Sequence, residues 1–97
     1  MDAPTFTWDP RKDAANQRKH GISFAEAQSA FLDDEALLLD DPDHSEAEDR
    51  FVLIGLSQQL RVLVVAHCYR ASDSEIRLIS ARRASRSESR RYAARGH

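Results

Sequence analysis

Histidine, glutamate and arginine side chains recur along this chain in positions that suit the cleavage of a phosphodiester. Without a metal, RNA cleavage needs a base for the 2′-hydroxyl proton, cations to stabilise the phosphorane and an acid for the leaving oxygen. Arginine fits the cationic role because its guanidinium binds phosphate through two parallel hydrogen bonds. The candidates for these three roles are His20, Glu48, Arg50, His67, Arg70 and Arg82.

Two pairs of residues are spaced so that they share one face of a strand. Successive side chains of a β-strand point to opposite faces, so residues two apart point the same way. Glu48 and Arg50 have this spacing, and an ion pair between them would present a guanidinium to phosphate. Ser80 and Arg82 have the same spacing. We therefore expect Arg50 and Arg82 to act as phosphate or transition-state clamps.

Two histidines are the candidates for proton transfer. His67 lies three residues before Arg70, near the end of a long predicted strand. Side chains three apart point to opposite faces, so we assume that the strand twists or bulges between these two residues. We expect His20 or His67 to act as acid or base, with Glu48 orienting one of them.

Each assignment has a structural alternative. His20 precedes Gly21 and can instead cap the last carbonyls of a helix. His67 lies in an apolar segment, where a histidine is commonly a hydrogen-bonded core residue. Glu48 and Arg50 can form an ordinary surface ion pair, worth under about 1 kcal/mol. The residue pattern leaves these alternatives open.

The two halves of the chain differ strongly in charge. The formal net charge of -2 averages residues 1–50, with 13 acidic and 5 basic side chains, and residues 51–97, with 3 acidic side chains and 9 arginines. Such asymmetry indicates an anionic partner for one face, and arginine favours nucleic acid because it grips phosphate and stacks on bases. The residues expected to contact RNA are Lys12, Lys19, Arg77 and Arg83.

The first helix is predicted from its two ends. Asp9 followed by Pro10 is typical of a helix start, with aspartate as the N-cap and proline at the first helical position. The helix should run to about His20 and end at Gly21, because glycine readily adopts the left-handed conformation of a C-cap.

Two further helices are predicted from capping boxes. Ser23 is followed three residues later by Glu26, and Ser85 by Glu88. The helix that begins at Ser23 has an apolar stripe that we expect in the core, formed by Phe24, Ala27, Ala30 and Phe31.

Five strands are predicted, one before the first helix at residues 5–8 and four between the second and third helices at residues 36–39, 50–56, 60–70 and 75–81. An acidic, turn-rich loop follows the second of them, and short polar connections join the last three. The order β-α-α-β-β-β-β-α predicts an α+β fold, in which an antiparallel sheet has helices against one side. With 97 residues, we expect a single domain that spans residues 1–97.

Several classes of protein are not expected from this sequence. The longest apolar runs, residues 36–39 and 62–66, are far shorter than the roughly 20 residues of a membrane helix. The N-terminus lacks a positive region followed by an apolar one, so we expect no export and a cytoplasmic location.

No cofactor is expected either. The single cysteine, Cys68, lies in an apolar stretch and should behave as a small hydrophobic residue. His44 stands beside Asp41 and Asp43, but a metal site would need a second histidine or cysteine at ligand spacing. We therefore expect no metal.

Three groups of residues resemble the signatures of one known family. The first is Phe6-Thr7-Trp8-Asp9 with Lys12, Asn16 and Lys19-His20-Gly21, followed by Phe24, Ala27 and Phe31-Leu32-Asp33. The second is Asp41-Pro42-Asp43-His44 with Glu48, Arg50 and Gly55. The third is Arg77-Leu78-Ile79-Ser80-Ala81-Arg82-Arg83-Ala84 with Glu88 and Tyr92. These groups resemble the signatures of the BrnT toxins, and the resemblance runs through almost the whole chain.

This resemblance implies a small RelE-like fold and a ribonuclease that arrests translation. It also implies a BrnA-type antitoxin, with which we expect a heterotetramer that represses its own operon and reaches operator DNA only through the antitoxin. A second hypothesis is a non-catalytic homologue that acts with its antitoxin as a binding module or co-repressor, and a third is a structural subunit of an unrelated complex. Arg82 and Arg83 can also be antitoxin contacts. Catalytic side chains that converge on one sheet face would favour the ribonuclease.

Overall fold

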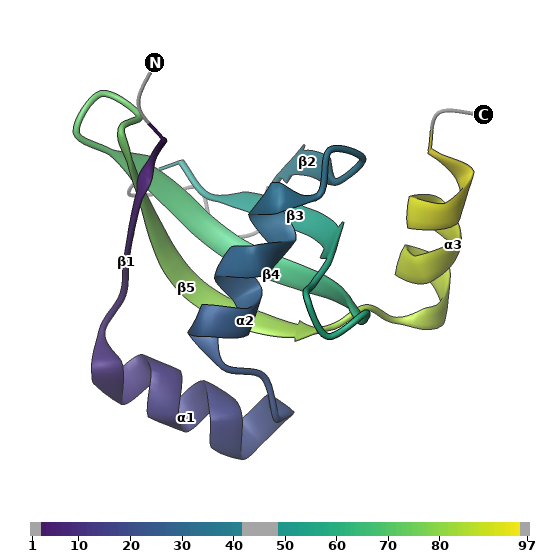
Figure 1. Ribbon diagram of the computed structural model, residues 1–97, viewed down its shortest axis with the longest axis horizontal. Helices are drawn as coiled ribbons and strands as arrows, with labels where there is room; N and C mark the ends of the chain where they lie inside the picture. The colour runs from purple at the N-terminus through teal and green to yellow at the C-terminus, as the bar shows by residue number, and fades with distance from the viewer. Residues whose placement is uncertain (1–2, 42–48, 96–97) are drawn as a thin grey trace.

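The computed structural model describes residues 3–41 and 49–95. The elements follow the predicted order, with one 3-10 turn added (Figure 1). Their bounds are β1 Thr5–Thr7, α1 Pro10–His20, α2 Phe24–Ser29, η1 Ala30–Leu32, β2 Leu37–Asp40, β3 Phe51–Leu56, β4 Val62–Arg70, β5 Glu75–Arg83 and α3 Arg86–Ala94. No helix among the described residues is long and apolar enough to cross a membrane.

The strands form one sheet in the order β1-β5-β4-β3-β2. Strands β2 to β5 make the predicted antiparallel meander. The expectation of a wholly antiparallel sheet is wrong for β1, which pairs in parallel with β5 from Thr5 opposite Glu75 to Thr7 opposite Arg77. No hairpin joins these two strands, so no turn dictates an antiparallel direction.

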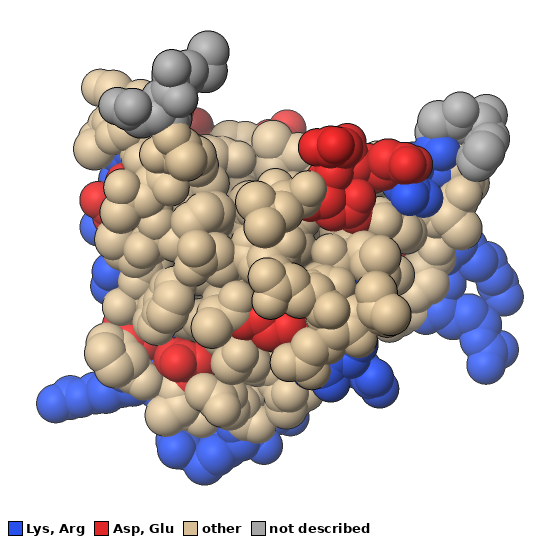
Figure 2. All heavy atoms as spheres, viewed as in Figure 1, with Lys and Arg blue, Asp and Glu red and all other residues tan. Residues whose placement is uncertain are grey.

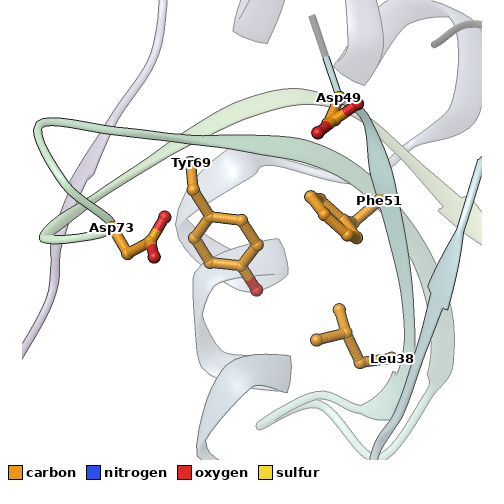
Figure 3. Close-up of a pocket in the computed structure, with 5 residues that line it drawn as sticks. All are labelled: Leu38, Asp49, Phe51, Tyr69 and Asp73. Carbon is orange, nitrogen blue, oxygen red and sulfur yellow. The ribbon is translucent and has the colours of Figure 1, made fainter.

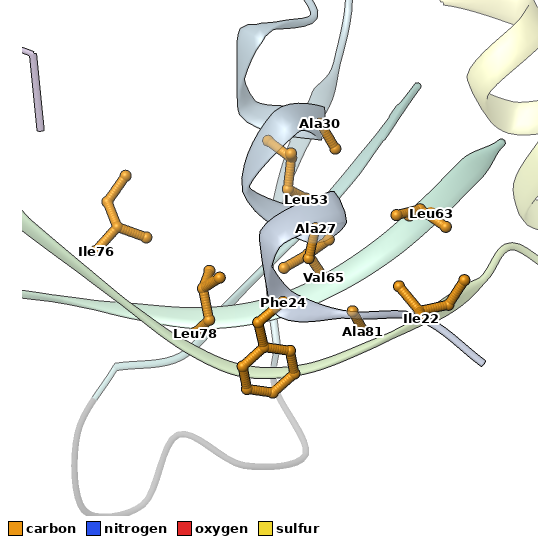
Figure 4. Packing of buried hydrophobic residues seen from close by; sticks show 10 residues of the cluster. All are labelled: Ile22, Phe24, Ala27, Ala30, Leu53, Leu63, Val65, Ile76, Leu78 and Ala81. Atoms are coloured by element: carbon orange, nitrogen blue, oxygen red, sulfur yellow. The ribbon is translucent and has the colours of Figure 1, made fainter. Parts of the chain in front are cut away.

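Helices cover both faces of the sheet, which corrects the expectation that they pack against one side. Figure 1 shows α2 crossing in front of β4 and β5, with α3 at the right. The larger core lies under α2, where Phe24 and Ala27 meet strand residues such as Val65 and Leu78 (Figure 4). On the other face, Tyr92 of α3 packs with Ile54 and Val64 in a smaller cluster. Partly buried apolar residues surround it: Leu37, Leu39, Val52, Val62 and Ala84.

The predicted helix ends are confirmed, with one exception. The Asp9 carboxylate accepts a hydrogen bond from the Arg11 amide at 2.8 Å, and Gly21 has a φ of 72°. The box at Ser85 and Glu88 is complete. At α2 the Ser23 hydroxyl caps the Glu26 amide as expected, but the Glu26 carboxylate turns away from the helix end.

Glu26 instead ties α2 to the β3–β4 turn. Its side chain is buried and accepts hydrogen bonds from the Ser57 hydroxyl at 2.7 Å and from the Arg61 guanidinium. The bond from Arg61 is the main reason why the pKa of Glu26 is lowered. A hydrogen bond from the charged Arg61 stabilises this buried carboxylate more than a bond from the neutral backbone N–H at the start of the helix would.

Asn16 of α1 closes the part of the β5 edge that β1 does not reach. Its amide nitrogen donates to the Ala81 carbonyl at 2.7 Å and to the Ile22 carbonyl at 2.8 Å. Its amide oxygen accepts from the Ala81 backbone N–H at 3.1 Å. Asn16 is 7% exposed, so these backbone groups would otherwise be buried without partners.

We predict that Asn16→Ala lowers the free energy of unfolding by about 3 kcal/mol, because it leaves buried backbone groups unsatisfied. Urea unfolding followed by circular dichroism measures this loss. Gln17→Ala is the control, since Gln17 is exposed and its amide bonds only to the Asp13 side chain. It should cost less than about 0.5 kcal/mol. Equal losses for the two variants would contradict the role of Asn16.

Candidate nucleic-acid interface

An extra residue in β5 determines which of its side chains share a face. Ala66 pairs with Ser80 and His67 with Leu78, so Ile79 is inserted as a β-bulge. Arg77 and Arg82 are five residues apart and would point to opposite faces of a regular strand. Because of the bulge, they lie opposite Cys68 and Val64, which share one face of β4.

We call this side of the sheet the arginine face, formed by Arg50, Arg70, Arg77, Ser80 and Arg82. Arg50 belongs to it because the β2–β3 ladder continues one bond past Phe51, from the Asp41 amide to the Arg50 carbonyl at 3.0 Å. The register that pairs Phe51 with His67, extended by one residue beyond β3, brings Arg50 opposite Cys68, whose other neighbour is Arg77. Arg50 and Arg77 therefore stand on either side of Cys68, with backbones about 10 Å apart.

Two lysines of α1 extend this basic surface. Asn16 points at the β5 edge, and Asp13 marks the side of α1 that meets α2, because its carboxylate accepts from the Phe24 amide at 2.9 Å. At 100° per residue, Lys12 and Lys19 fall on the opposite side of Asn16 from Asp13. Both are exposed, and Figure 2 shows basic side chains along the lower edge of the molecule, over α1. They flank the arginine face as predicted RNA contacts would.

Arg82 is held by α3. Its guanidinium donates two parallel hydrogen bonds to the Glu88 carboxylate, at 2.7 and 2.9 Å. The bond from Arg82 is the main cause that lowers the pKa of Glu88 to about 2, and the same pair raises the pKa of Arg82. Glu88 also accepts from the Ser85 amide at 2.7 Å. The capping box of α3 thus fixes the direction of Arg82.

His67 lies on the other side of the sheet, in the core. It is fully buried and its ring contacts Phe31 and Phe51. The bulge stands before His67, and the register from His67 to Arg70 is unbroken, so the assumed break between these residues is wrong. The structure does not bring them together. Burial is the main cause that lowers the pKa of His67, as expected for a core histidine.

Two other predicted site residues, Arg83 and His20, also fall outside the arginine face. Arg83 lies opposite Leu63 on the α2 side, where its charge helps to lower the pKa of Glu26. His20 is half-buried in the last turn of α1, on the same side of the helix as Asp13. Glu48, and with it His44, lies outside the described residues.

One carboxylate on the arginine face, that of Glu75, was not among the predicted site residues. Glu75 lies opposite Arg70 across the β4–β5 hairpin, and its Oε2 accepts from the Thr7 hydroxyl at 2.8 Å. Only four residues connect β4 to β5, and this short connection predicts a hairpin in which Arg70 and Glu75 lie opposite each other. Within residues 3–41 and 49–95, no three histidine, cysteine or acidic side chains gather as metal ligands.

Comparison with known proteins points to one family. A family described as "Ribonuclease toxin, BrnT, of type II toxin-antitoxin system" matches residues 8–88. Among solved structures, the fold is similar to the crystal structure of the Brucella abortus ribonuclease toxin BrnT, with a TM-score of 0.65 and 27% sequence identity. The similarity covers 87% of this chain and 100% of that one. No curated protein matches the sequence.

We predict that the stabilising effect of Glu88 disappears in acid. Its folded pKa of about 2 lies below the ordinary 4.5, so its contribution is present above pH 4.5 and is lost as the pH falls toward 2. Relative to Glu88→Gln, the wild type should gain about 1 kcal/mol at pH 7 and almost nothing at pH 2. Urea unfolding across this range measures the difference. A difference that does not change with pH would contradict the ion pair with Arg82.

We predict that His67 weakens the fold between pH 7 and pH 5. Its folded pKa lies below the ordinary 6.5, so the unfolded chain takes up a proton more readily and stability falls as the pH drops through this window. The wild type should lose up to about 1 kcal/mol per pH unit that His67→Gln does not lose. Thermal unfolding of both proteins at each pH tests this. Parallel pH profiles would rule it out.

Proposed function

Because this chain belongs to the BrnT family of ribonuclease toxins from type II toxin-antitoxin systems, we propose that it is an endoribonuclease whose active surface is the arginine face. The observation that carries this proposal is the gathering of Arg50, Arg77 and Arg82 on one side of the sheet. A phosphate bound over Cys68 would lie between the guanidinium groups of Arg50 and Arg77.

The arginines supply what a metal-independent cleavage needs most. The ribose 2′-oxygen attacks phosphorus, the bond from phosphorus to the 5′-oxygen breaks, and a 2′,3′-cyclic phosphate and a 5′-hydroxyl result. Negative charge grows on the phosphoryl oxygens on the way, and cations fixed on strands stabilise it without rearranging. Arg50 and Arg77 act as the clamp, while Arg82, oriented by Glu88, contacts the same or the next phosphate.

Proton transfer is assigned to two carboxylates, Glu75 and Glu48. Glu75 lies on the arginine face, and Glu48 precedes Arg50 by two residues in the sequence. Either can take the proton of the 2′-hydroxyl, and the departing 5′-oxygen takes up a proton from water. Glu88 is a poor base, because its pKa of about 2 reflects its commitment to Arg82. Neither His67, in the core, nor His20, on the α2 side of α1, is assigned a proton-transfer step.

The same proposal includes the biological setting of the cleavage. RNA enters along Lys12 and Lys19, and its cleavage in the cytoplasm inhibits translation. A BrnA-type antitoxin neutralises the protein, and the two form a heterotetramer that represses the operon through DNA contacts of the antitoxin. The family supports an antitoxin partner and an RNA target, and the arginine face supplies the surface for the RNA.

We predict that partner-free protein cleaves long single-stranded RNA in the presence of EDTA. Arg50→Ala, Arg77→Ala and Arg82→Ala should each reduce the cleavage rate by about 100-fold or more, because each removes a cation that stabilises the transition state. Arg83→Ala is the matched control, since it removes the same charge from the opposite face. Its rate should stay within about threefold of the wild type.

Three outcomes would overturn this assignment. An equal loss in Arg83→Ala would mean that overall charge, and not the arginine face, sets the rate. Cleavage that stops in EDTA would refute the metal-independent reaction. RNA that is bound but left intact by the folded, partner-free protein would favour the non-catalytic binding module.

A further inference from the structure

A cavity of about 470 Å³ opens on the side of the sheet opposite the arginine face. It is lined by Leu38, Asp49, Phe51, Tyr69 and Asp73 (Figure 3). Phe51 and Tyr69 are neighbours of His67 in β3 and β4 and point to the same side as its ring. The reaction proposed above uses none of these residues.

Two aromatic rings form a wall of the cavity. The centroids of Phe51 and Tyr69 lie 5.2 Å apart, with an angle of 66° between the ring planes. Leu38 of β2 is 52% exposed and completes the apolar part of the lining. A flat, partly apolar ligand would therefore find a ring face to stack on.

The polar groups of the cavity all accept hydrogen bonds. His67 contacts the Val65 carbonyl through Nδ1 at 3.0 Å, and a carbonyl only accepts, so Nδ1 carries the proton of the neutral ring. Its Nε2 then accepts from the Tyr69 hydroxyl at 3.2 Å. The Tyr69 proton is thus used within the core, which leaves its oxygen lone pairs, together with Asp49 and Asp73, to receive donors from a ligand.

The two carboxylates are not neutralised within the described residues, where neither Asp49 nor Asp73 has a hydrogen-bond or ion-pair partner. Burial, and after it the charge of Asp73, raises the pKa of the Tyr69 phenol. Asp73 is held in place by a turn in which Ala71, Ser72 and Asp73 all have positive φ, the last at 70°. The cavity therefore has two negative charges beside an aromatic wall.

We propose that this cavity binds a guanidinium group, presented as an arginine side chain by a protein partner. Arginine fits the lining because its planar cation stacks on an aromatic ring while its N–H groups reach carboxylates in the same plane. An ammonium group would satisfy the charge but would not use the flat ring surface as fully. The site lies across the sheet from the arginine face, so its occupation does not depend on RNA cleavage.

The test is a titration of the full-length, partner-free chain with the blocked peptide acetyl-Gly-Arg-Gly-amide, followed by two-dimensional NMR. We expect saturable shifts at Phe51, Tyr69 and Asp73, with a dissociation constant on the order of 1 mM. The peptide with citrulline in place of arginine has the same shape without the charge and should bind at least about tenfold more weakly. Asp73→Asn should weaken binding of the arginine peptide by a similar factor.

Asp34→Asn is the matched control, because it removes the same charge from an exposed aspartate between η1 and β2. It should leave the dissociation constant unchanged. Asparagine tolerates the left-handed conformation at position 73, and Asp49→Asn provides a second variant that does not touch this turn. Equal binding of the citrulline peptide, equal weakening by Asp34→Asn, or shifts outside the cavity would each overturn the proposal.

Discussion

The position of one inserted residue decides what this sheet can do. Ile79 adds a bulge to β5, and the alternation of side chains restarts on the other side of it. Before the bulge, Ile76 and Leu78 enter the core while Arg77 faces outward; after it, Ala81 enters the core while Arg82 faces outward. A regular strand would have buried an arginine or exposed a core residue. The bulge thus reconciles a continuous core with a continuous cationic surface.

The two sides of the sheet are stabilised by different interactions, apolar packing on one side and ion pairs on the other. On the α2 side, apolar packing is supplemented by buried polar bonds of Asn16 and Glu26 that hold α1 and α2 in place. On the arginine face, burial is incomplete and direction comes from charge, as in the two parallel bonds from Arg82 to Glu88. The packed α2 side therefore supports a solvent-exposed side on which arginines are held at fixed spacing. Binding a polyanion requires such an arrangement.

Local signals such as helix caps predicted where the helices and strands lie. They could not predict which residues far apart in the sequence contact each other. Asp9 and Gly21 delimit α1 because capping involves only neighbouring residues. The parallel direction of β1 and the fate of the Glu26 carboxylate depend on partners far along the chain, Glu75 and Arg61. For the candidate site, residue types at spacing two indicated Arg50 and Arg82 as clamps, but not Arg77. They did not reveal the bulge, so the side of the sheet reached by each histidine and arginine could not be derived.

The hairpin between β4 and β5 contains strained backbone, and this strain can be relieved by substitution. Ala71, Ser72 and Asp73 have φ values of 51°, 57° and 70°, a region in which an L residue with a Cβ is disfavoured by about 1 kcal/mol or more. Glycine has no such penalty, although it has more freedom to lose on folding. The hairpin is thus a natural place to begin when a more heat-tolerant form of the protein is wanted. Glycine at Ala71 or Ser72 would relax the backbone there without changing a residue on either face of the sheet.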